Sequence, residues 1–88
     1  MKIEASKQYR REIRKNIDAL LVSPEYIEDM YCLQNRLPLP AKYKDHPLSG
    51  DWQGFRDCHI KNDLLLIYRI SGDILELARL NTHAEIFG

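Results

Sequence analysis

Three short apolar segments in the second half of the chain limit its fold more than any other feature. Residues 54–60, 63–70 and 73–80 each have the length and composition of a β-strand, and only two residues separate one from the next. Two-residue connections join antiparallel neighbours in hairpins, and Gly72 can supply the positive φ that such turns need. The segments therefore predict an antiparallel meander, with the almost continuously apolar segment 63–70 in its centre and turns at Lys61-Asn62 and Ser71-Gly72.

Two helices are predicted before the meander. Ser6 is a suitable N-cap for a helix that runs to about Leu21, and Ser23-Pro24-Glu25 is a typical start for a second helix that ends near Asn35 or Arg36. The short connection between them makes an antiparallel helical hairpin. Helical spacing of apolar side chains predicts the buried faces: Tyr9, Ile13, Ile17, Leu20 and Leu21 on the first helix, and Ile27, Met30, Tyr31 and Gln34 on the second, with Leu33 and Leu37 beside them.

The remaining segments complete an α+β fold. Residues 1–5 predict a weak first strand, because only Ile3 is a good strand former, and residues 82–87 a short last strand. Residues 38–53 predict a long polar loop, which in so small a domain usually serves function. We therefore expect one domain over residues 1–88, in which the helical hairpin packs on one face of a twisted antiparallel sheet and the other face is left for function.

The charges of the chain are balanced overall but gather at one place. Thirteen Lys and Arg match thirteen Asp and Glu, which argues against a strong nonspecific nucleic-acid binder. Residues 1–20, however, hold six of the basic side chains and three of the acidic ones. This basic stripe of the first helix either is a solvated surface or contacts RNA phosphate or an acidic partner protein. Its members follow helical spacing: Lys7, Arg10, Arg11, Arg14 and Lys15.

The sequence predicts a protein without a metal ion, in a reducing compartment. Cys32 and Cys58 are too few for a disulfide scaffold and lack the C-x-x-C spacing of zinc sites. The histidines match no zinc motif, so we expect no metal and no other cofactor. No apolar run approaches membrane-spanning length and no signal-like stretch precedes the domain, so we expect no membrane partner and a reducing, cytoplasmic location.

All three histidines lie in the second half of the chain, in strings of polar and turn residues: His46 in KDHPL, His59 in RDCHI and His83 in NTHAEIFG. Imidazole exchanges protons near neutral pH, because its ordinary pKa is about 6.5. With nearby carboxylates and arginines, three imidazoles suggest acid–base chemistry on a phosphate-bearing substrate. A histidine in a small domain is more often a surface or packing residue, and that alternative stays open for each of them.

Strand alternation makes specific predictions around the first predicted strand. Asp57 and His59 share one face, whereas Cys58 points to the other and fits a small core residue better than a nucleophile. Arg56 then falls on the face under the helices, where its charge requires a bulge or an edge position. Asp63, which opens the central strand, is either a turn residue or a carboxylate that orients an imidazole.

Two runs of the sequence, KDHPLSGDWQGFRDCHIKNDLLLIYRI and RLNTHAEIFG, closely resemble the YafQ-like toxins of the RelE/ParE superfamily. These are small bacterial toxins of type II toxin–antitoxin systems. The resemblance is close over about residues 37–88, whereas the helical half agrees in layout only. It implies catalytic roles for His46, His59, Asp63, His83 and Phe87. The family usually has glycine before the Thr-His pair; Asn81 stands there in this chain, and asparagine tolerates positive φ better than most residues.

The resemblance also implies an activity and partners. It implies a ribosome-dependent endoribonuclease that cleaves mRNA in the decoding site and is blocked by an antitoxin protein. Metal-free cleavage needs a base, an acid and a group that stabilises charge on the phosphate, for which Arg79 or a protonated histidine is suited. Phe87 can stack on a base, although by itself a terminal aromatic residue is more often a core anchor. Further candidates for RNA contact are Lys44, Arg10, Arg11 and Arg14.

Two other functions remain open on the same fold. One is a noncatalytic toxin of the ParE kind, which binds and poisons DNA gyrase, and the other is a plain protein-interaction module. The histidines argue against the gyrase-binding toxin, because a pure binding module does not need three imidazoles near one face of a sheet. Cell growth on expression would separate the protein-interaction module from both toxins.

Overall fold

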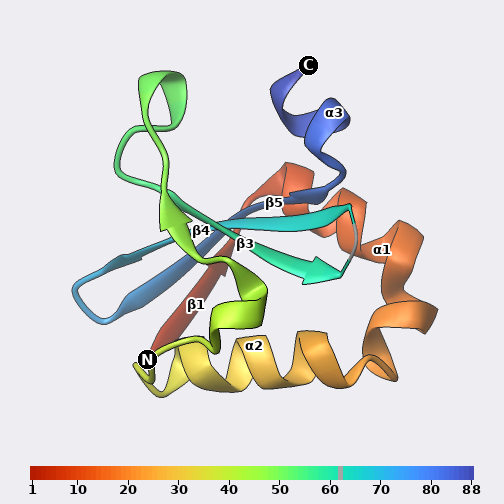
Figure 1. Cartoon of the computed structure of the whole chain (residues 1–88), viewed down its shortest axis with the longest axis horizontal. Coiled ribbons are helices and arrows are strands. Elements are labelled where there is room, and N and C mark those ends of the chain that lie inside the picture. The colour runs from red at the N-terminus through yellow and green to blue at the C-terminus, as the bar shows by residue number, and fades with distance from the viewer. Residues whose placement is uncertain (62) are drawn as a thin grey trace.

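The structure is a computed structural model, and it describes residues 1–61 and 63–88. Its five strands form one sheet in the order β1-β5-β4-β3-β2, and α1 and α2 cover one face of that sheet (Figure 1). The α+β architecture with a helical hairpin is therefore confirmed. The elements are β1 (Lys2–Ala5), α1 (Lys7–Leu21), α2 (Pro24–Gln34), η1 (Ala41–Tyr43), β2 (His46–Pro47), η2 (Gly50–Trp52), β3 (Arg56–Lys61), β4 (Leu64–Ser71), β5 (Ile74–Asn81) and α3 (His83–Phe87).

The predicted meander is confirmed as β3, β4 and β5, each of which begins one or two residues later than the pattern indicated. Both neighbouring pairs are antiparallel, with β4 in the centre. Gly72 has a φ of 60°, as expected for the second turn. The other predicted turn, Lys61-Asn62, includes a residue that lies outside the described ones. The register of β3 against β4 shifts between His59 and Lys61, and that of β4 against β5 shifts at Ile67.

The first strand corrects the prediction of a wholly antiparallel sheet. β1 pairs in parallel with β5, from Lys2 opposite Ile74 to Ala5 opposite Leu77. Parallel neighbours need a long connection between them, and here everything from α1 to β4 provides it. The N-terminal strand β1 therefore forms one edge of the sheet, next to the C-terminal strand β5.

Both helices begin where their caps predicted. The side chain of Ser6 accepts a hydrogen bond from the Tyr9 amide (2.9 Å), and Ser23 accepts one from Tyr26 (3.2 Å), with Pro24 as the first residue of α2. On α1, Tyr9 and Leu20 are buried and Ile13 is half-buried, but Ile17 and Leu21 remain exposed. The apolar stripe therefore predicted only part of the buried face of this helix.

The predicted buried face of α2 is right for Met30 and Leu33, which pack in the core, but wrong for Ile27, Tyr31 and Gln34. Ile27 and Tyr31 are 56% and 61% exposed, whereas the helix buries Asp29, Cys32 and Leu33. The reason is that a carboxylate occupies the centre of the inner face, while two large apolar residues lie outside. Counting apolar residues therefore could not show which side of α2 faces the sheet.

Two further segments differ from their predictions. The supposed loop 38–53 contains β2 and the two 3-10 turns η1 and η2. Residues 83–87 form a short helix instead of a last strand. The physical reason is an N-cap: the Thr82 hydroxyl accepts a hydrogen bond from the Glu85 amide (3.2 Å), and Thr-x-x-Glu is the spacing of a capping box.

The sheet carries apolar clusters on both faces. The larger one lies under the helices and joins Tyr9, Leu20 and Leu33 to Cys58 and Leu66. On the opposite face, Leu65, Ile67 and Ile86 pack together with half-buried Leu48, Trp52, Phe55 and Ala78. The face that we expected to be left for function is thus partly covered by α3 and by the segment around η2. None of the described helices is long and apolar enough to cross a membrane.

A carboxylate without full hydrogen bonding lies between α2 and β3. Asp29 is completely buried, and its Oδ2 accepts a hydrogen bond from the Cys58 thiol at 3.5 Å. Its Oδ1 has no hydrogen-bond partner among the described residues. Burial raises the pKa of Asp29 to about 6, despite the bond from Cys58.

Replacing this carboxylate should change how stability depends on pH. Because the folded state holds its proton up to about pH 6, the native protein loses stability as pH rises from about 4 to about 6, by about 3 kcal/mol for a shift of this size. We expect Asp29→Asn to remove this loss. The measurement is urea unfolding from pH 4 to pH 7, with Asp18→Asn on the exposed side of α1 as control. The same pH slope in wild type and Asp29→Asn would contradict the assignment.

Candidate active site

The candidate site is built on the face of β3 that is turned away from the helices. Cys58 points to α2, so Asp57 and His59 point to the opposite face, as strand alternation predicted. The short strand β2 lies beside β3 and places His46 directly opposite Asp57. Two histidines that are 13 positions apart in the sequence are thereby brought to one carboxylate.

The two imidazoles approach opposite oxygens of Asp57. His46 Nε2 lies 3.8 Å from Oδ2, and His59 Nε2 lies 3.7 Å from Oδ1. These distances are too long for hydrogen bonds, so the carboxylate acts on the rings mainly through its charge. The Asp57 side chain is 4% exposed, whereas that of His46 is 49% exposed. A buried carboxylate therefore lies beneath two rings that a substrate can reach.

The third histidine lies on the same side of the sheet, because α3 begins at His83 and packs through Ile86 on Leu65 and Ile67. Burial raises the pKa of Asp57, and the positive forms of His46, His59 and His83 oppose that rise. The three imidazoles that the sequence distributes over residues 46 to 83 converge on one side of the sheet.

The backbone fixes the tautomer of His46. Its Nδ1 lies 2.7 Å from the carbonyl oxygen of Lys44, so Nδ1 carries the proton and donates it. Lys44 is the C-cap of η1 and has a left-handed φ of 50°. In this conformation its carbonyl oxygen faces the His46 ring. Nε2, on the side of Asp57, is then the nitrogen that can gain or lose a proton.

A second network supports this segment from the helix-covered face. The Arg56 guanidinium donates to Asp45 through Nε (3.2 Å) and Nη2 (2.9 Å), and the Tyr68 hydroxyl donates to the same carboxylate at 2.6 Å. The charge of Arg56 on the helix-covered face is therefore compensated by Asp45, which lies in the segment just before the edge strand β2. Asp45 directly precedes His46, so the network also holds the chain at the site.

The helix α3 carries His83 and Phe87. Their rings lie 4.9 Å apart between centroids, and Phe87 is partly exposed, while Ile86 anchors the helix in the smaller apolar cluster. Asp63 accepts a hydrogen bond from the backbone amide of His83 at 3.2 Å. Asp63 therefore holds the start of α3 through the backbone. None of the hydrogen bonds described for the Asp63 side chain goes to an imidazole ring.

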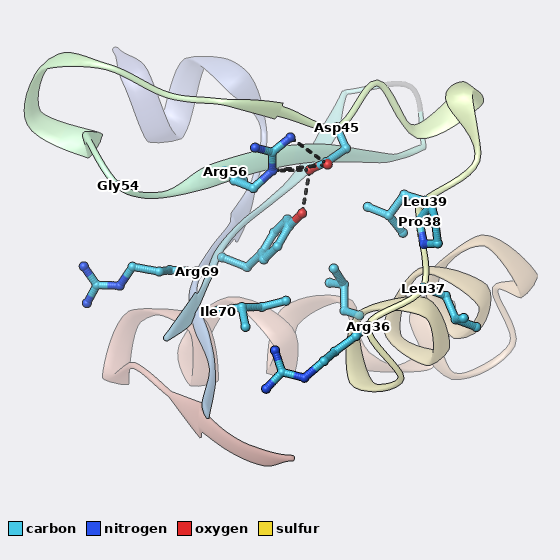
Figure 2. Close-up of a pocket in the computed structure, with 11 residues that line it drawn as sticks. Arg36, Leu37, Pro38, Leu39, Asp45, Gly54, Arg56, Arg69 and Ile70 are labelled. Atoms are coloured by element: carbon cyan, nitrogen blue, oxygen red, sulfur yellow. Dashed lines mark hydrogen bonds and ion pairs between the residues drawn. The ribbon is translucent and has the colours of Figure 1, made fainter. Parts of the chain in front are cut away.

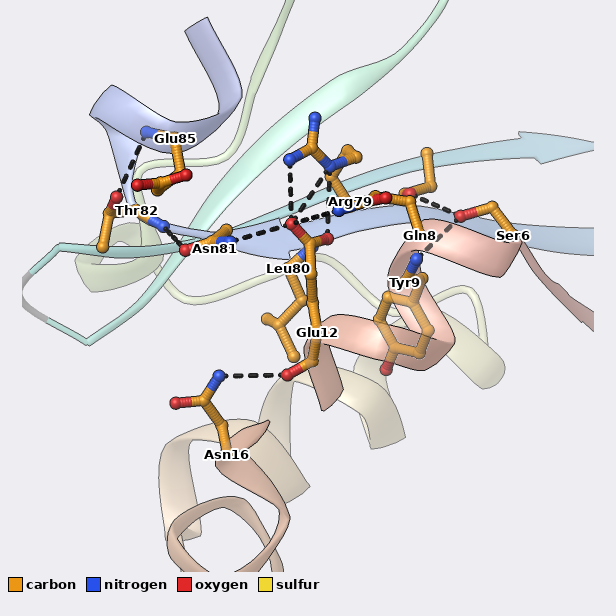
Figure 3. A network of polar contacts seen from close by, with 11 residues as sticks. Ser6, Gln8, Tyr9, Glu12, Asn16, Arg79, Leu80, Asn81, Thr82 and Glu85 are labelled. Atoms are coloured by element: carbon orange, nitrogen blue, oxygen red, sulfur yellow. Dashed lines mark hydrogen bonds and ion pairs between the residues drawn. The ribbon is translucent and has the colours of Figure 1, made fainter. Parts of the chain in front are cut away.

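Arg79 is bound within the protein. Its Nε and Nη2 donate to Glu12, at 3.2 and 2.8 Å, and the same carboxylate accepts from the Leu80 amide and from the Asn81 side chain, both at 2.9 Å (Figure 3). Burial opposes ionisation of Glu12, but these hydrogen bonds outweigh it and lower the pKa of Glu12. Arg79 Nη1 donates to no residue that the structure describes.

Asn81 does not use the positive φ that we considered for it. It ends β5, donates from Nδ2 to Glu12 and accepts the Thr82 amide on Oδ1 at 2.8 Å. Its side chain thus directs the backbone from β5 into α3.

The five residues of the basic stripe and Lys44 are all exposed, but the stripe lies on α1, across the sheet from the histidines.

Three acidic residues of this region were not among the predicted site residues. Asp57 was detectable, because it lies two positions before His59 on a strand. Glu12 and Asp45 gave weaker signals. Glu12 lies three positions after Tyr9 on the buried side of α1, and Asp45 precedes a histidine in a segment without a clear pattern. Neither position reveals its distant partner in the sequence.

Comparison with known proteins agrees with this geometry. A family model described as a bacterial toxin of type II toxin-antitoxin system, YafQ, matches residues 1–88. The putative toxin YafQ of Haemophilus influenzae is 44% identical over 92 residues (97% of this chain, 90% of the relative), and the mRNA interferase toxin YafQ of Escherichia coli K12 is 40% identical over 92 residues (98% and 95%). A crystal structure of the E. coli DinJ–YafQ complex matches with 39% identity and a TM-score of 0.82, over 98% of this chain and 97% of that one. This chain therefore belongs to the YafQ family of bacterial toxins of type II toxin–antitoxin systems.

Proposed function

We propose that this toxin is an endoribonuclease that cleaves mRNA on the ribosome by histidine acid–base catalysis, without a metal ion. The observation that carries the proposal is the approach of His46 and His59 to the buried carboxylate of Asp57, with His83 at the start of α3 on the same side of the sheet. The related E. coli toxins are named mRNA interferases, which supports the choice of substrate. A noncatalytic gyrase-binding toxin would have no use for this arrangement.

The proposed reaction needs two proton transfers. A neutral imidazole takes the proton of a ribose 2′-hydroxyl, whose oxygen attacks the adjacent phosphorus. The bond between phosphorus and the 5′-oxygen breaks, and an imidazolium donates a proton to that leaving oxygen. The products are a 2′,3′-cyclic phosphate and a free 5′-hydroxyl. Asp57 stabilises the imidazolium forms, and DNA, which has no 2′-hydroxyl, is spared.

Other residues hold the substrate in this proposal. Negative charge on the phosphate is stabilised by the third imidazole or by Nη1 of Arg79, which is held in place by Glu12. The exposed part of Phe87 stacks on a base, and Lys44 contacts the RNA backbone beside His46. Asp63 contributes by positioning His83 through the amide at the start of α3.

The proposed partners are mRNA on the ribosome and a cognate antitoxin protein. The E. coli relative forms a complex with DinJ, which supports a protein inhibitor for this chain as well. We infer a cytoplasmic location, since translating ribosomes are found there and since both cysteines are buried and unbridged.

The proposal predicts the effect of removing one imidazole. His83→Ala should lower mRNA cleavage in a translating extract by about 100- to 10,000-fold, the usual contribution of a general acid or base. The fold should persist, because Ile86 and Thr82 rather than the His83 ring anchor α3. Glu85→Gln on the same helix is the matched control, since that side chain is exposed and glutamine keeps the capping-box pattern. A folded His83→Ala protein that cleaves at the wild-type rate would exclude His83 from the mechanism.

The basic stripe predicts a separate effect on binding. We expect it to contact ribosomal RNA or an acidic antitoxin segment rather than the reacting phosphate, because α1 and the histidines lie on opposite faces of the sheet. Changing Arg10, Arg11 and Arg14 to Glu should weaken one of these associations. If the partner is ribosomal RNA, the change should also flatten the salt dependence of binding by about two to three units of log affinity per log salt. Binding to ribosomes and to antitoxin over a salt series measures this. Unchanged affinity for both at low salt would mean a merely solvated surface.

A further inference from the structure

A groove of about 410 Å³ borders the candidate active site at the edge of β3. It is lined by Glu25 at the start of α2, by residues 42–44 of η1 and its cap, and by residues 59–61 at the end of β3. β2 pairs with β3 only at Arg56 and Asp57, so no described strand lies beside β3 along the groove. Because His59 belongs both to the groove and to the candidate site, the groove continues the site along an open edge of the sheet.

The positive charges of this groove are only partly compensated within the chain. Lys42, Lys44 and Lys61 line it, and Glu25 is the one acidic residue among the described lining residues. Lys42 Nζ lies 3.3 Å from a carboxylate oxygen of Glu28, so its charge is matched. Lys44 and Lys61 are exposed, and neither takes part in any ion pair of the described residues. Two ammonium groups without a partner carboxylate thus border the groove.

Both of these lysines lie on segments that also carry a histidine of the candidate site. The Lys44 carbonyl accepts the hydrogen bond from the His46 ring, and the adjacent Asp45 is held by Arg56, as Figure 2 shows. On the other wall, the register of β3 against β4 shifts just before Lys61, and such bulges often redirect a side chain beside an active site. The positions of the lysines are therefore tied to those of the imidazoles.

We propose that the groove holds a second phosphate of the bound RNA, the one next to the cleaved phosphate along the strand, between the ammonium groups of Lys44 and Lys61. An ammonium group is a compact charge that binds phosphate well. The RNA backbone carries a phosphate at every nucleotide, so a strand with one phosphate at the imidazoles brings its neighbour to the adjoining groove. This inference rests on the proposed RNA cleavage and adds how the strand is aligned across the site.

The groove fits a phosphate better than a base or a protein segment. Bases stack on exposed aromatic faces, but the Tyr43 ring in the groove is 1% exposed. Protein segments are usually anchored by apolar side chains in open pockets, and Ile60, the aliphatic residue of the lining, is 2% exposed. The accessible parts of the groove are therefore its charged and polar groups.

The test removes one charge from each side of the proposed contact. Lys44→Gln and Lys61→Gln should each lower the second-order rate constant for cleavage of ribosome-bound mRNA by about five-fold, the upper end for an exposed ion pair. A second mRNA carries an uncharged methylphosphonate at one phosphate beside the cleaved bond, on the 5′ side or on the 3′ side. For one of these two mRNAs, wild type should lose a similar factor, and the lysine variants should lose no more than wild type. The nucleotide before the altered linkage has a 2′-deoxy sugar in the test and reference mRNA alike, so that only the charge differs.

Two further variants are the controls. Lys61→Arg keeps the positive charge and should cleave every mRNA nearly as wild type does. Lys2→Gln removes an exposed lysine on β1, at the opposite edge of the sheet, and should also behave as wild type does. Thermal unfolding of each variant checks that it is folded.

The outcomes separate the groove from the wider proposal. A wild-type toxin that leaves ribosome-bound mRNA intact would overturn the proposed cleavage and the groove together. Wild-type cleavage by both glutamine variants would overturn the groove alone. A loss in these variants that is the same on both altered mRNAs as on the reference would assign the lysines to ribosomal RNA and also overturn it. Unchanged cleavage with weaker binding of purified antitoxin, measured by calorimetry, would overturn it in favour of a protein segment.

Discussion

The carboxylate of Glu12 joins the parts of the molecule that the site depends on. β1 covers β5 only as far as Leu77, and beyond that point Glu12 of α1 takes the place of a neighbouring strand by accepting the Leu80 amide. The same carboxylate accepts hydrogen bonds from the Arg79 guanidinium and from the side-chain amide of Asn81. Removing one partner of a buried ion pair costs about 3–5 kcal/mol, because the other charge is left without compensation. α1, β5 and the start of α3 are thereby held as one unit.

Three buried carboxylates in this small protein have different environments. Glu12 receives several hydrogen bonds, which lower its pKa, so it remains charged and structural. Asp29 and Asp57 each have an oxygen without a hydrogen-bond partner among the described residues, and burial raises the pKa of both. Asp57 is surrounded by imidazoles, whereas Asp29 faces a thiol in the core. Incomplete hydrogen bonding of a buried carboxylate is costly, and at Asp57 the proposed acid–base chemistry of the histidines gives a reason for it.

Local signals in the sequence predicted what local physics decides. The two-residue connections gave the meander, the serine caps gave the helix starts, and alternation along β3 placed Asp57 with His59 and Cys58 on the other face. What failed depends on distant partners. The inner face of α2 depends on Asp29 meeting Cys58, the parallel edge depends on β1 meeting β5, and Arg79 is tied by a residue 67 positions away. The short helix α3 was missed although its Thr-x-x-Glu cap is local, because the apolar end of the chain also fits a strand.

The pairing of β1 with β5 has a consequence for the order in which the protein becomes complete during synthesis. β1 leaves the ribosome first, but its only partner strand is made after every other strand of the sheet. The Glu12 carboxylate likewise waits for residues 79–81, and α3 follows them. A growing chain therefore lacks one edge of its sheet and the segment with His83 and Phe87 until residues 82–87 emerge. Under the proposed function, the synthesis of the toxin is in this way separated in time from the folded form that would cleave mRNA.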